Sequence, residues 1–485
     1  MPYEGFQGAG IAPTPAPAQY ALEQNFLDLR TSGWAQQYLP ELVEQEAEVF
    51  GNRTVAGFLE KVGAEEAMAS DQVIWSEQGR LHLSYTGTTH ATVNGKINIA
   101  ADVDGNSIDQ QGEAGIGVRK GDTVIVSKSG SSGATVKCYV SAVTNTPGTE
   151  TSITVKPYTV ANLNDVTNIS ANTAVSVFVY GSEYQKGTDG RETSNSPSFK
   201  SLSNNPIILK DKFAISGSDA SQIGWVEVSG EDGQSGYLWY LKAAGDTKAR
   251  FTDYCEMSLI EAEKAASGSG AAGQNLKGSE GLFAALNDRG NIMHGDLELE
   301  QFNFMLKELD KQGAIEENML FLDRTESLLV DDFLAGINAP YDGGTSYGVF
   351  DNDSDMALNL GFNGFRRGSY DFYKTDWKYL NDIATRGGVL DTTSYTSGDP
   401  VGKVRGVMVP AGTSSVYDQS LGKNIKRPFL HVRYRAAGLE DRKFKTWTTG
   451  SVGASTSDLD AMEMHFLTER CLVVQGANNF FMIEG

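Results

Sequence analysis

The feature that most constrains the fold is a long helical pattern between Ser235 and Ala266. Its apolar residues recur every three or four positions and so share one helix face; they are Tyr237, Leu241, Ala244, Phe251, Cys255, Leu259 and Ala262. At 1.5 Å per residue the helix would run roughly 45 Å, about the width of a domain. Taken alone, the pattern favours a buried core helix over a strut. The Gly- and Ser-rich segment Ser267–Gly273 predicts its end.

The charge balance limits the partners of the chain. Its 485 residues include 40 basic and 62 acidic ones, which gives a net charge of -22. Phosphate contacts require clustered cations, so this balance argues against nucleic-acid binding as the main activity. The same charge would suit a container that must not stick to an acidic cargo. The length is enough for about three domains.

Three cysteines, Cys138, Cys255 and Cys471, are odd in number and widely spaced. They can form neither a disulfide framework nor a CxxC zinc pattern, so we expect reduced thiols in a cytoplasmic folding compartment. The N-terminus lacks the basic start and apolar run of a signal peptide. No stretch reaches the roughly 18 apolar residues of a membrane helix. We therefore expect a soluble protein that is intracellular when made.

The first part of the chain changes character twice. Residues 1–33 form a Gly-, Pro- and Ala-rich leader, which we interpret as disordered or as an extended arm. Trp34–Met68 has a helical and acidic pattern. From about Thr86 to Ser182 the sequence is helix-poor, and its alternating segments predict an inserted small sandwich or barrel. The expected strands are Thr92–Ile99, Asp122–Ser127, Ala134–Thr144, Thr151–Tyr158 and Ala174–Tyr180.

Strand signals flank this insert on both sides. Val73–Tyr85 precedes it, and Ile207–Trp225 follows the polar segment Glu183–Asn205, which we expect to be mobile. The pattern suggests a projecting β-hairpin that carries the extra domain near its tip.

Beyond the Gly/Ser linker the pattern becomes mixed α and β. We expect a helix from Asp296 to Gln312, with Leu299, Phe302, Leu306 and Leu309 buried. Asn318–Asp323 predicts a buried strand. Asp323 and Glu326 predict a capping box for a helix to about Ile337. Later strands are expected at Ser369–Lys374, Val404–Pro410, Phe429–Tyr434, Met462–Val474 and Phe480–Ile483.

The sequence contains short matches to catalytic and binding motifs, but none lies in the structural context that its motif requires. Gly268–Gly273 fits GxGxxG but follows a helix, and Gly344–Gly348 fits GxSxG without a leading strand. Asp351–Asp355 and the segment from Asp102 to Glu113 only partly match calcium loops, so an acidic turn is the simpler interpretation. The five histidines show no metal-ligand spacing. We predict no cofactor, no metal and no enzymatic activity.

One stretch is rich in basic residues: Lys426, Arg427, Arg433, Arg435, Arg442, Lys443 and Lys445. The simpler interpretation is a solvated face. The sharper one is that these cations pair with the acidic N-terminal third of another copy of the chain.

The order of these elements resembles major capsid proteins of tailed bacteriophages, which have the Hong Kong 97 fold. That family has an N-terminal arm, a projecting extended loop, a long spine helix, an axial α/β domain and closing strands. The segment Phe466–Phe481 is also similar to the closing strand of the family, with Glu469-Arg470, a short apolar run and a late Phe. The overall character is nearest to large podophages such as the crAss-like group.

The resemblance implies an α+β chain divided into five parts. Residues 1–70 would be the arm and acidic helix, 71–234 the extended loop with an inserted β domain at about 86–182, and 235–279 the spine helix and linker. Residues 280–410 would form the axial domain and 411–485 the return strands. The short leader implies a separate scaffolding protein. A Lys–Asn pair for covalent cross-linking is not identifiable.

The function implied is self-assembly into the icosahedral shell that encloses double-stranded DNA in the virion. Expected partners are other copies in hexamers and pentamers, a scaffolding protein, a portal, auxiliary head proteins and non-specifically contacted DNA, with no membrane. Candidate assembly residues are Trp34, Lys210, Lys212, Phe213, Trp225, Arg433 and Arg435. The alternatives are an encapsulin-like cellular compartment and a phage structural protein with a carbohydrate-binding β domain, in which Tyr139, Tyr158 and Tyr180 would be aromatic platforms.

Overall fold

The computed structural model describes residues 59, 64–78, 82–103, 105, 107–108, 115–130, 133–146, 150–191, 199–220, 227–229, 235–295, 297–312, 315–338, 363–382, 385–386, 404–411, 413–418, 423–452 and 455–484. These residues combine helices and strands, as expected for an α+β chain. The chain divides into two compact units, which we describe separately. Unit 2 is Ser76–Ser201, and unit 1 comprises the residues before and after it.

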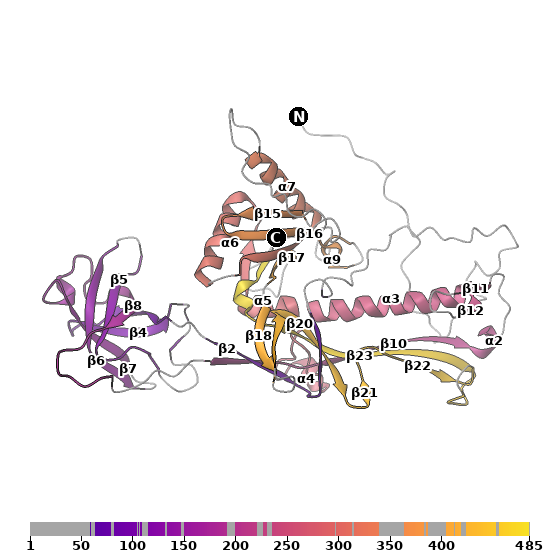
Figure 1. Ribbon diagram of the computed structural model, residues 1–485. Helices are drawn as coiled ribbons and strands as arrows, with labels where there is room; N and C mark the ends of the chain where they lie inside the picture. Colours follow the sequence, from indigo (N-terminus) through magenta and orange to yellow (C-terminus); the bar gives the residue numbers. More distant parts are fainter. Residues whose placement is uncertain are drawn as a thin grey trace. The chain divides into compact units, whose positions relative to one another are not determined.

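The first sheet of unit 1 has the strand order β1-β20-β23-β10, and helix α3 (Leu238–Glu261) lies along β10 and β23 (Figure 1). β23 is central: β10 pairs with one edge of it, and β22 and β20 pair with the other. β1 is parallel to β20, and β21 adds a short hairpin. The strands are β1 (Glu65–Met68), β10 (Ile207–Ser216), β20 (Leu430–Ala437), β21 (Glu440–Asp441), β22 (Lys445–Gly450) and β23 (Ala461–Val474).

Helix α3 is held on this sheet by apolar residues one turn apart. Phe251 and Cys255 are buried together with Phe466 of β23. The Phe251 and Phe466 rings lie 5.8 Å apart. Further along, Leu259 enters the main core of unit 1. The buried helix face predicted from the spacing is therefore confirmed at these positions, and α3 is anchored at more than one point.

The second sheet of unit 1 has the order β13-β24-β17-β14-β16-β15. Its strands are β13 (Asn291–His294), β14 (Glu317–Leu322), β15 (Asn363–Arg367), β16 (Tyr370–Asp376), β17 (Val404–Pro410) and β24 (Phe481–Glu484). Both faces of this sheet are buried. Adjacent residues on a strand point to opposite sides of the sheet, and here they enter two different cores. In β14, Leu320 enters the core beside Phe302 of α6 (Leu299–Gln312) and Val330 of α7 (Arg324–Asn338). Phe321 enters the opposite core.

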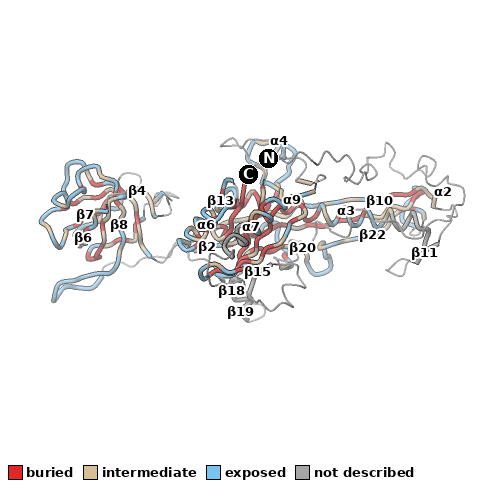
Figure 2. The backbone as a smooth tube through the Cα atoms, turned by 90° about the horizontal axis from the view of Figure 1, so that it is seen from above, coloured by how far each residue is buried: buried red, intermediate tan, exposed pale blue. Residues whose placement is uncertain are grey.

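That opposite core joins the two sheets of unit 1. It contains Leu259 of α3, Leu282 of α5 (Leu282–Arg289) and Phe321, together with Leu430 of β20 and Leu472 of β23. Figure 2 shows the buried residues concentrated in this part of unit 1. Neither sheet can therefore be lost without exposing apolar side chains of the other.

The remaining elements are short. They are α2 (Gly217–Ala220), α4 (Gly270–Gly273), α9 (Lys378–Asn381), the 3₁₀ turns η2 (Leu163–Asp165) and η3 (Ala477–Asn479), and two strand pairs, β11 (Glu227–Ser229) with β12 (Ser235–Tyr237) and β18 (Thr413–Asp418) with β19 (Lys423–Pro428).

Unit 2 contains a closed barrel with the order β3-β4-β7-β6-β5-β8. Its strands are β3 (Ser84–Thr89), β4 (Lys96–Asp102), β5 (Asp122–Lys128), β6 (Thr135–Thr146), β7 (Glu150–Pro157) and β8 (Ala174–Ser182). Val136, Cys138 and Val140 of β6 alternate into its core, as their spacing predicts. Closure leaves this barrel without a free strand edge.

The chain enters unit 2 along β2 (Val73–Gln78) and returns along β9 (Phe199–Asn204), and these two strands pair with each other. Asn204 fixes the return point within unit 1. Its buried side-chain amide donates to the carbonyl oxygens of Leu472 (2.7 Å) and Glu280 (2.9 Å), and its oxygen accepts from the Glu280 N–H at 2.8 Å. The end of β9 is therefore tied to β23 and to the loop before α5.

Two expected helices are corrected. α3 is shorter than Ser235–Ala266 because Ser235–Tyr237 is strand β12, paired with β11, and the helix ends at Glu261. The helical pattern predicted to extend to Met68 ends earlier, because Glu65–Met68 is strand β1, which pairs with β20. Of the preceding segment, Leu59, which is helical, and Ala64 lie within the described residues.

The predicted hairpin is also corrected. Ile207–Ser216 pairs with β23 over its whole length and not with the strand before the barrel. The partner of β2 is instead β9, which lies in the segment Glu183–Asn205 that we expected to be mobile. These pairings join segments far apart in sequence, which local periodicity does not report. The strands expected late in the chain are confirmed as β16, β17, β20, β23 and β24.

The predicted capping box is half right. Asp323 Oδ1 accepts the backbone N–H of Glu326 at 2.7 Å, as an N-cap does. The Glu326 side chain does not return the bond: its carboxylate accepts from the Leu297 N–H (2.9 Å) and from Arg405 Nη1 (2.9 Å). In the helix before it, Phe302 and Leu309 are buried as expected, whereas Leu299 is exposed.

Candidate functional site

A group of charged residues in the described part of unit 1 lies where β1 joins the first sheet. The register places Glu66 opposite Arg433 and Met68 opposite Arg435. We call this group the charged seam, and we define it by the ion-paired residues Glu65, Glu66, Asp71, Arg433, Arg435, Lys443 and Arg470.

The seam holds β1 from both faces, because consecutive residues of a strand point to opposite sides. Glu66 Oε2 lies 2.7 Å from Arg433 Nη1. Glu65 pairs instead with Lys443 and, at 3.7 Å, with Arg470 Nη1 of β23. Residues from three segments therefore form ion pairs with β1: β20, the loop between β21 and β22, and β23.

A further acidic residue connects the seam to the next strand. Glu469 Oε2 lies 2.7 Å from Arg442 Nε, and Glu469 Oε1 lies 3.9 Å from Arg435 Nη1. Arg435 also donates to Asp71, and this hydrogen bond, followed by the charge of the guanidinium, lowers the pKa of the Asp71 carboxyl. The same contact raises the pKa of Arg435. Asp71 is exposed, so solvent and salt screen this pair.

Among the predicted assembly residues, the structure brings Arg433 and Arg435 together in the seam. Their ion-pair partners there belong to the same chain, which is a different arrangement from pairing with the N-terminal third of another copy. Lys443 likewise pairs with Glu65 of its own chain.

The other predicted residues lie elsewhere. Lys210, Lys212 and Phe213 are on β10, at the opposite edge of the sheet from β1. Lys210 is exposed, and Lys212 Nζ is 3.3 Å from Glu463 Oε1. Phe213 is 6% exposed, so its side chain is packed inside unit 1 and is not available at the surface. Trp34 and Trp225 lie outside the described residues.

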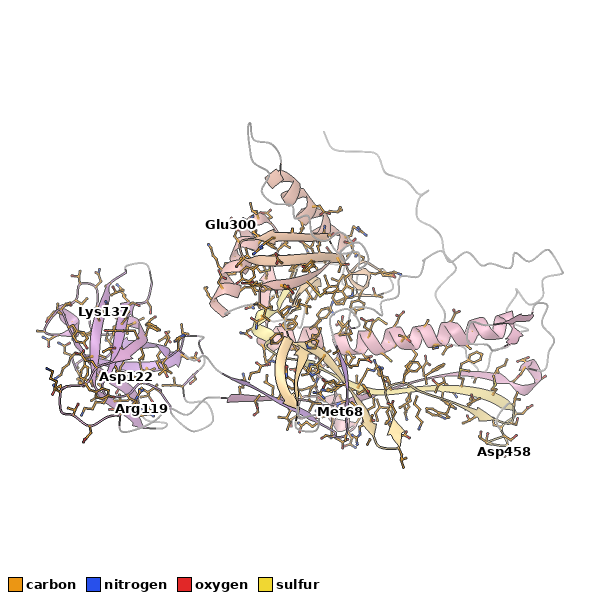
Figure 3. The ribbon with its side chains drawn as sticks, in the orientation of Figure 1. Met68, Arg119, Asp122, Lys137, Glu300 and Asp458 are labelled. Atoms are coloured by element: carbon orange, nitrogen blue, oxygen red, sulfur yellow. The ribbon has the colours of Figure 1, made fainter. Side chains whose placement is uncertain are left out.

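The sequence patterns missed a set of exposed apolar side chains in unit 1. Phe304 of α6 is 55% exposed and Leu328 of α7 is 54% exposed, although both helices bury other residues against the second sheet. Leu439 is fully exposed at the tip of the β20–β21 hairpin, after Gly438 with φ 51°. A signal existed for Phe304: it falls outside the face formed by Phe302, Met305 and Leu309. Figure 3 labels Glu300, in the first turn of α6.

Within the described residues, no group of three or more His, Cys, Asp or Glu side chains is arranged to hold a metal ion. The GxSxG segment and Asp351–Asp355 lie outside these residues, as does most of the loop after Asp102. Gly268–Gly273 spans a turn and the short helix α4, so it is not a dinucleotide loop that follows a strand. No helix of the described part is long and apolar enough to span a membrane.

All three cysteines are free and buried. Burial raises the pKa of Cys138 to about 12, that of Cys255 to about 11 and that of Cys471 to about 12. Thiols with such values are almost entirely protonated near neutral pH and are poor nucleophiles.

No protein-family model matches the chain, and no curated protein matches its sequence. Solved structures that are similar to it include chains from bacteriophages, among them capsid structures. A chain from Microbacterium phage Oxtober96 is 8% identical, with a TM-score of 0.37 over 94% of this chain and 99% of that chain. A chain from Mycobacterium phage Cain is 8% identical, with a TM-score of 0.32 over 93% and 96%. A chain from the asymmetric unit of the bacteriophage PhiM1 mature capsid is 11% identical, with a TM-score of 0.31 over 63% and 78%.

Proposed function

We propose that this chain is the major capsid protein of a tailed bacteriophage and has the Hong Kong 97 fold. The observation that carries the proposal is the layout of unit 1. A long helix, α3, lies along the extended strands β10 and β23, and a second sheet covered by α6 and α7 adjoins it through a shared core. In the proposal, α3 is the spine helix, and the second sheet with α6 and α7 belongs to the axial domain.

In this proposal the β2–β9 pair is the base of the extended loop, and the barrel is an insertion carried by it. The proposed parts are an arm and acidic helix within 1–70, a loop within 71–234 with its insert at about 86–182, a spine and linker at 235–279, an axial domain at 280–410 and return strands at 411–485. Strands β1 and β10 fall inside the first two ranges but belong to the first sheet. A position near the crAss-like podophages is part of the proposal and rests on the sequence resemblance alone.

Copies of the chain would assemble as hexamers and pentamers into an icosahedral shell in the virion, around the double-stranded DNA. A scaffolding protein, a portal and auxiliary head proteins complete the proposed partners. Phe304, Leu328 and Leu439 are the proposed contacts between copies, because each is a large apolar side chain that is exposed in the single chain. The net charge of -22 supports a shell that does not adhere to its DNA.

The test is negative-stain electron microscopy of the full-length recombinant chain, beside size-exclusion chromatography with light scattering. We expect closed shells or rings of five and six copies. A strictly monodisperse monomer at every salt and protein concentration would count against the proposal. An encapsulin-like compartment would be recognised by a co-purifying enzyme cargo instead of DNA.

Two substitutions test the proposed contacts between copies of the chain. Phe304→Asp and Leu328→Asp should abolish or strongly reduce assembly, while the free energy of unfolding changes by less than about 0.5 kcal/mol because both side chains are exposed. Thr325→Asp is the matched control, since it introduces the same single negative charge at an exposed position of α7 without removing a large apolar side chain. Normal shells from both apolar variants would exclude these helices as contacts.

A further inference from the structure

The outer surface of the barrel in unit 2 carries a groove that the proposed shell function does not use. Its volume is about 1070 Å³, and it lies over β5, β6, β8 and the residues that follow β7. We define the tyrosine groove by six of its lining residues, Thr123, Lys137, Tyr158, Tyr180, Ser182 and Glu183. Figure 3 labels Lys137 on the barrel.

The strand register explains why these side chains face outward. Val124, Val136 and Cys138 point into the barrel core, so the residues that alternate with them point away from it. Lys137 of β6 lies opposite Ile125 of β5 on this outer side.

A β-bulge places Tyr180 in the groove. Thr123 pairs with Gly181 and Val124 pairs with Val179, so Tyr180 is an extra residue of β8 with no opposite partner on β5. Bulges of this kind redirect a side chain. A Cβ at Gly181 would lie 3.3 Å from Thr123 Oγ1, so a larger residue at that position would crowd the Thr123 side chain.

Two tyrosine rings are the main surfaces of the groove. Tyr158 is 49% exposed and Tyr180 is 46% exposed. The Tyr158 hydroxyl donates to Glu183 Oε2 at 2.5 Å, and this hydrogen bond is the largest cause that raises the pKa of Tyr158 to about 12. Tyr158 therefore remains a neutral donor near neutral pH, with its ring position fixed by Glu183.

We propose that the tyrosine groove binds a neutral oligosaccharide. The rings offer flat surfaces for the apolar faces of pyranose rings, and the Thr123, Ser182, Lys137 and Glu183 side chains offer donors and acceptors for sugar hydroxyls. The volume lies at the upper end of the range for small-ligand sites, which fits more than one sugar unit.

Other ligand classes fit less well. A nucleic acid would need several cations along its phosphates, and the residues that line the groove include one lysine and one glutamate. An extended peptide would add to a free strand edge, and the closed barrel has none. The proposal is independent of shell formation, so failure of one leaves the other standing.

The test applies the fluorescently labelled full-length chain to an array of neutral hexose and N-acetylhexosamine oligosaccharides of two to six units. The best binder is then titrated calorimetrically against Tyr158→Ala, Tyr180→Ala and Glu183→Gln. We expect each alanine variant to weaken binding by about tenfold or more, because it removes one stacking surface. Glu183→Gln should weaken binding by a smaller factor, because it replaces a charged acceptor for sugar hydroxyls by a neutral one. Tyr158→Phe should retain most of the affinity, since it keeps the ring.

Phe178→Ala is the matched control: this ring is on the same strand, is 40% exposed and does not line the groove. It should bind as the unchanged chain does, and the thermal unfolding of all variants should match. Absence of binding to every glycan would overturn the proposal. So would equal binding by the unchanged chain, Tyr180→Ala and Glu183→Gln.

Discussion

The barrel of unit 2 and the first sheet of unit 1 both contain six strands, but they use the chain in opposite ways. The barrel strands lie between Ser84 and Ser182, in one continuous part of the sequence. The sheet joins β1, β10 and the strands from β20 to β23, which are separated by much longer segments. Joining such distant segments costs more chain entropy. Burial of apolar side chains in the shared core must offset this free-energy cost.

The two regions also differ in how they end. The barrel closes on itself and leaves no edge, whereas β1 and β10 lie at the ends of an open sheet order. The comparison indicates that unit 2 is stabilised locally and that unit 1 depends on segments from both sides of the barrel. The following predictions test whether the two units respond separately.

The largest effects should come from buried apolar residues. Phe302→Ala should cost about 4 kcal/mol in unit 1, and Ile153→Ala should cost about 3 kcal/mol in unit 2, because both side chains are fully buried. Differential scanning calorimetry should show two transitions, each lowered by one substitution only. Phe178→Ala, at an exposed position of the barrel, is the control. A single transition that responds to both core substitutions would contradict the separation.

Glu326 is a second way to perturb unit 1 alone. Its fully buried carboxylate accepts from Arg405 and from the Leu297 N–H, so Glu326→Ala should cost about 2 kcal/mol. Burial raises the pKa of Glu326 above its ordinary value of 4.5. The native state then binds more protons than the unfolded chain between the two values, and stability falls as the pH rises through that window.

Glu326→Gln should remove this pH dependence, because it cannot titrate. The measurement is denaturant unfolding as a function of pH, with the barrel transition as the internal control. An unchanged pH profile in the Gln variant would show that another group is responsible.

Substitutions in the charged seam should lower the stability of unit 1 by a smaller amount. Arg433→Ala and Glu66→Ala should each lower the stability of unit 1 by about 1 kcal/mol, because the pair is partly buried and belongs to a network. The loss should shrink at high salt. A double-mutant cycle measured by urea unfolding isolates the coupling of the two residues. Lys156→Ala, an exposed position in unit 2, should change neither transition. A coupling of zero at low salt would contradict the assigned role.

The smallest perturbation is chemical labelling of the buried thiols. At pH 8 we expect almost no reaction of Cys138, Cys255 or Cys471 with a disulfide reagent, because burial keeps the thiols protonated and inaccessible. Slow labelling, followed by mass spectrometry, should report opening of unit 2 at Cys138 and opening of unit 1 at the other two. Ile153→Ala should accelerate only Cys138. Labelling of all three cysteines at the same rate would indicate that the two units open together.

Local periodicity predicted the parts of the fold that are built locally. Val136, Cys138 and Val140 alternate into the barrel core, and Phe251, Cys255 and Leu259 share one face of α3. The pairings of β1 with β20 and of β2 with β9 were missed, because each joins distant segments without a pattern that identifies the partner.

The candidate sites show the same limit. Arg433 and Arg435 were identified as notable cations, but their partners Glu66 and Asp71 required the structure. Tyr158 and Tyr180 were identified as aromatic candidates from the sequence. Their position beside one groove depends on the bulge at Tyr180 and on the end of β7. The adjacent Gly181 and Pro157 are consistent with these features but do not specify which strand the two tyrosines face.

The succession of β23 and β24 has a consequence for biosynthesis. These two strands follow each other in the chain, yet one is central to the first sheet and the other is inside the second. While a ribosome is still translating the codons before Ala461, both sheets lack a strand, although the barrel strands have long since emerged. A nascent chain stalled near residue 440 should therefore contain a protease-resistant barrel beside an unfinished unit 1. In the proposed shell, synthesis itself would then delay the association of one copy with another.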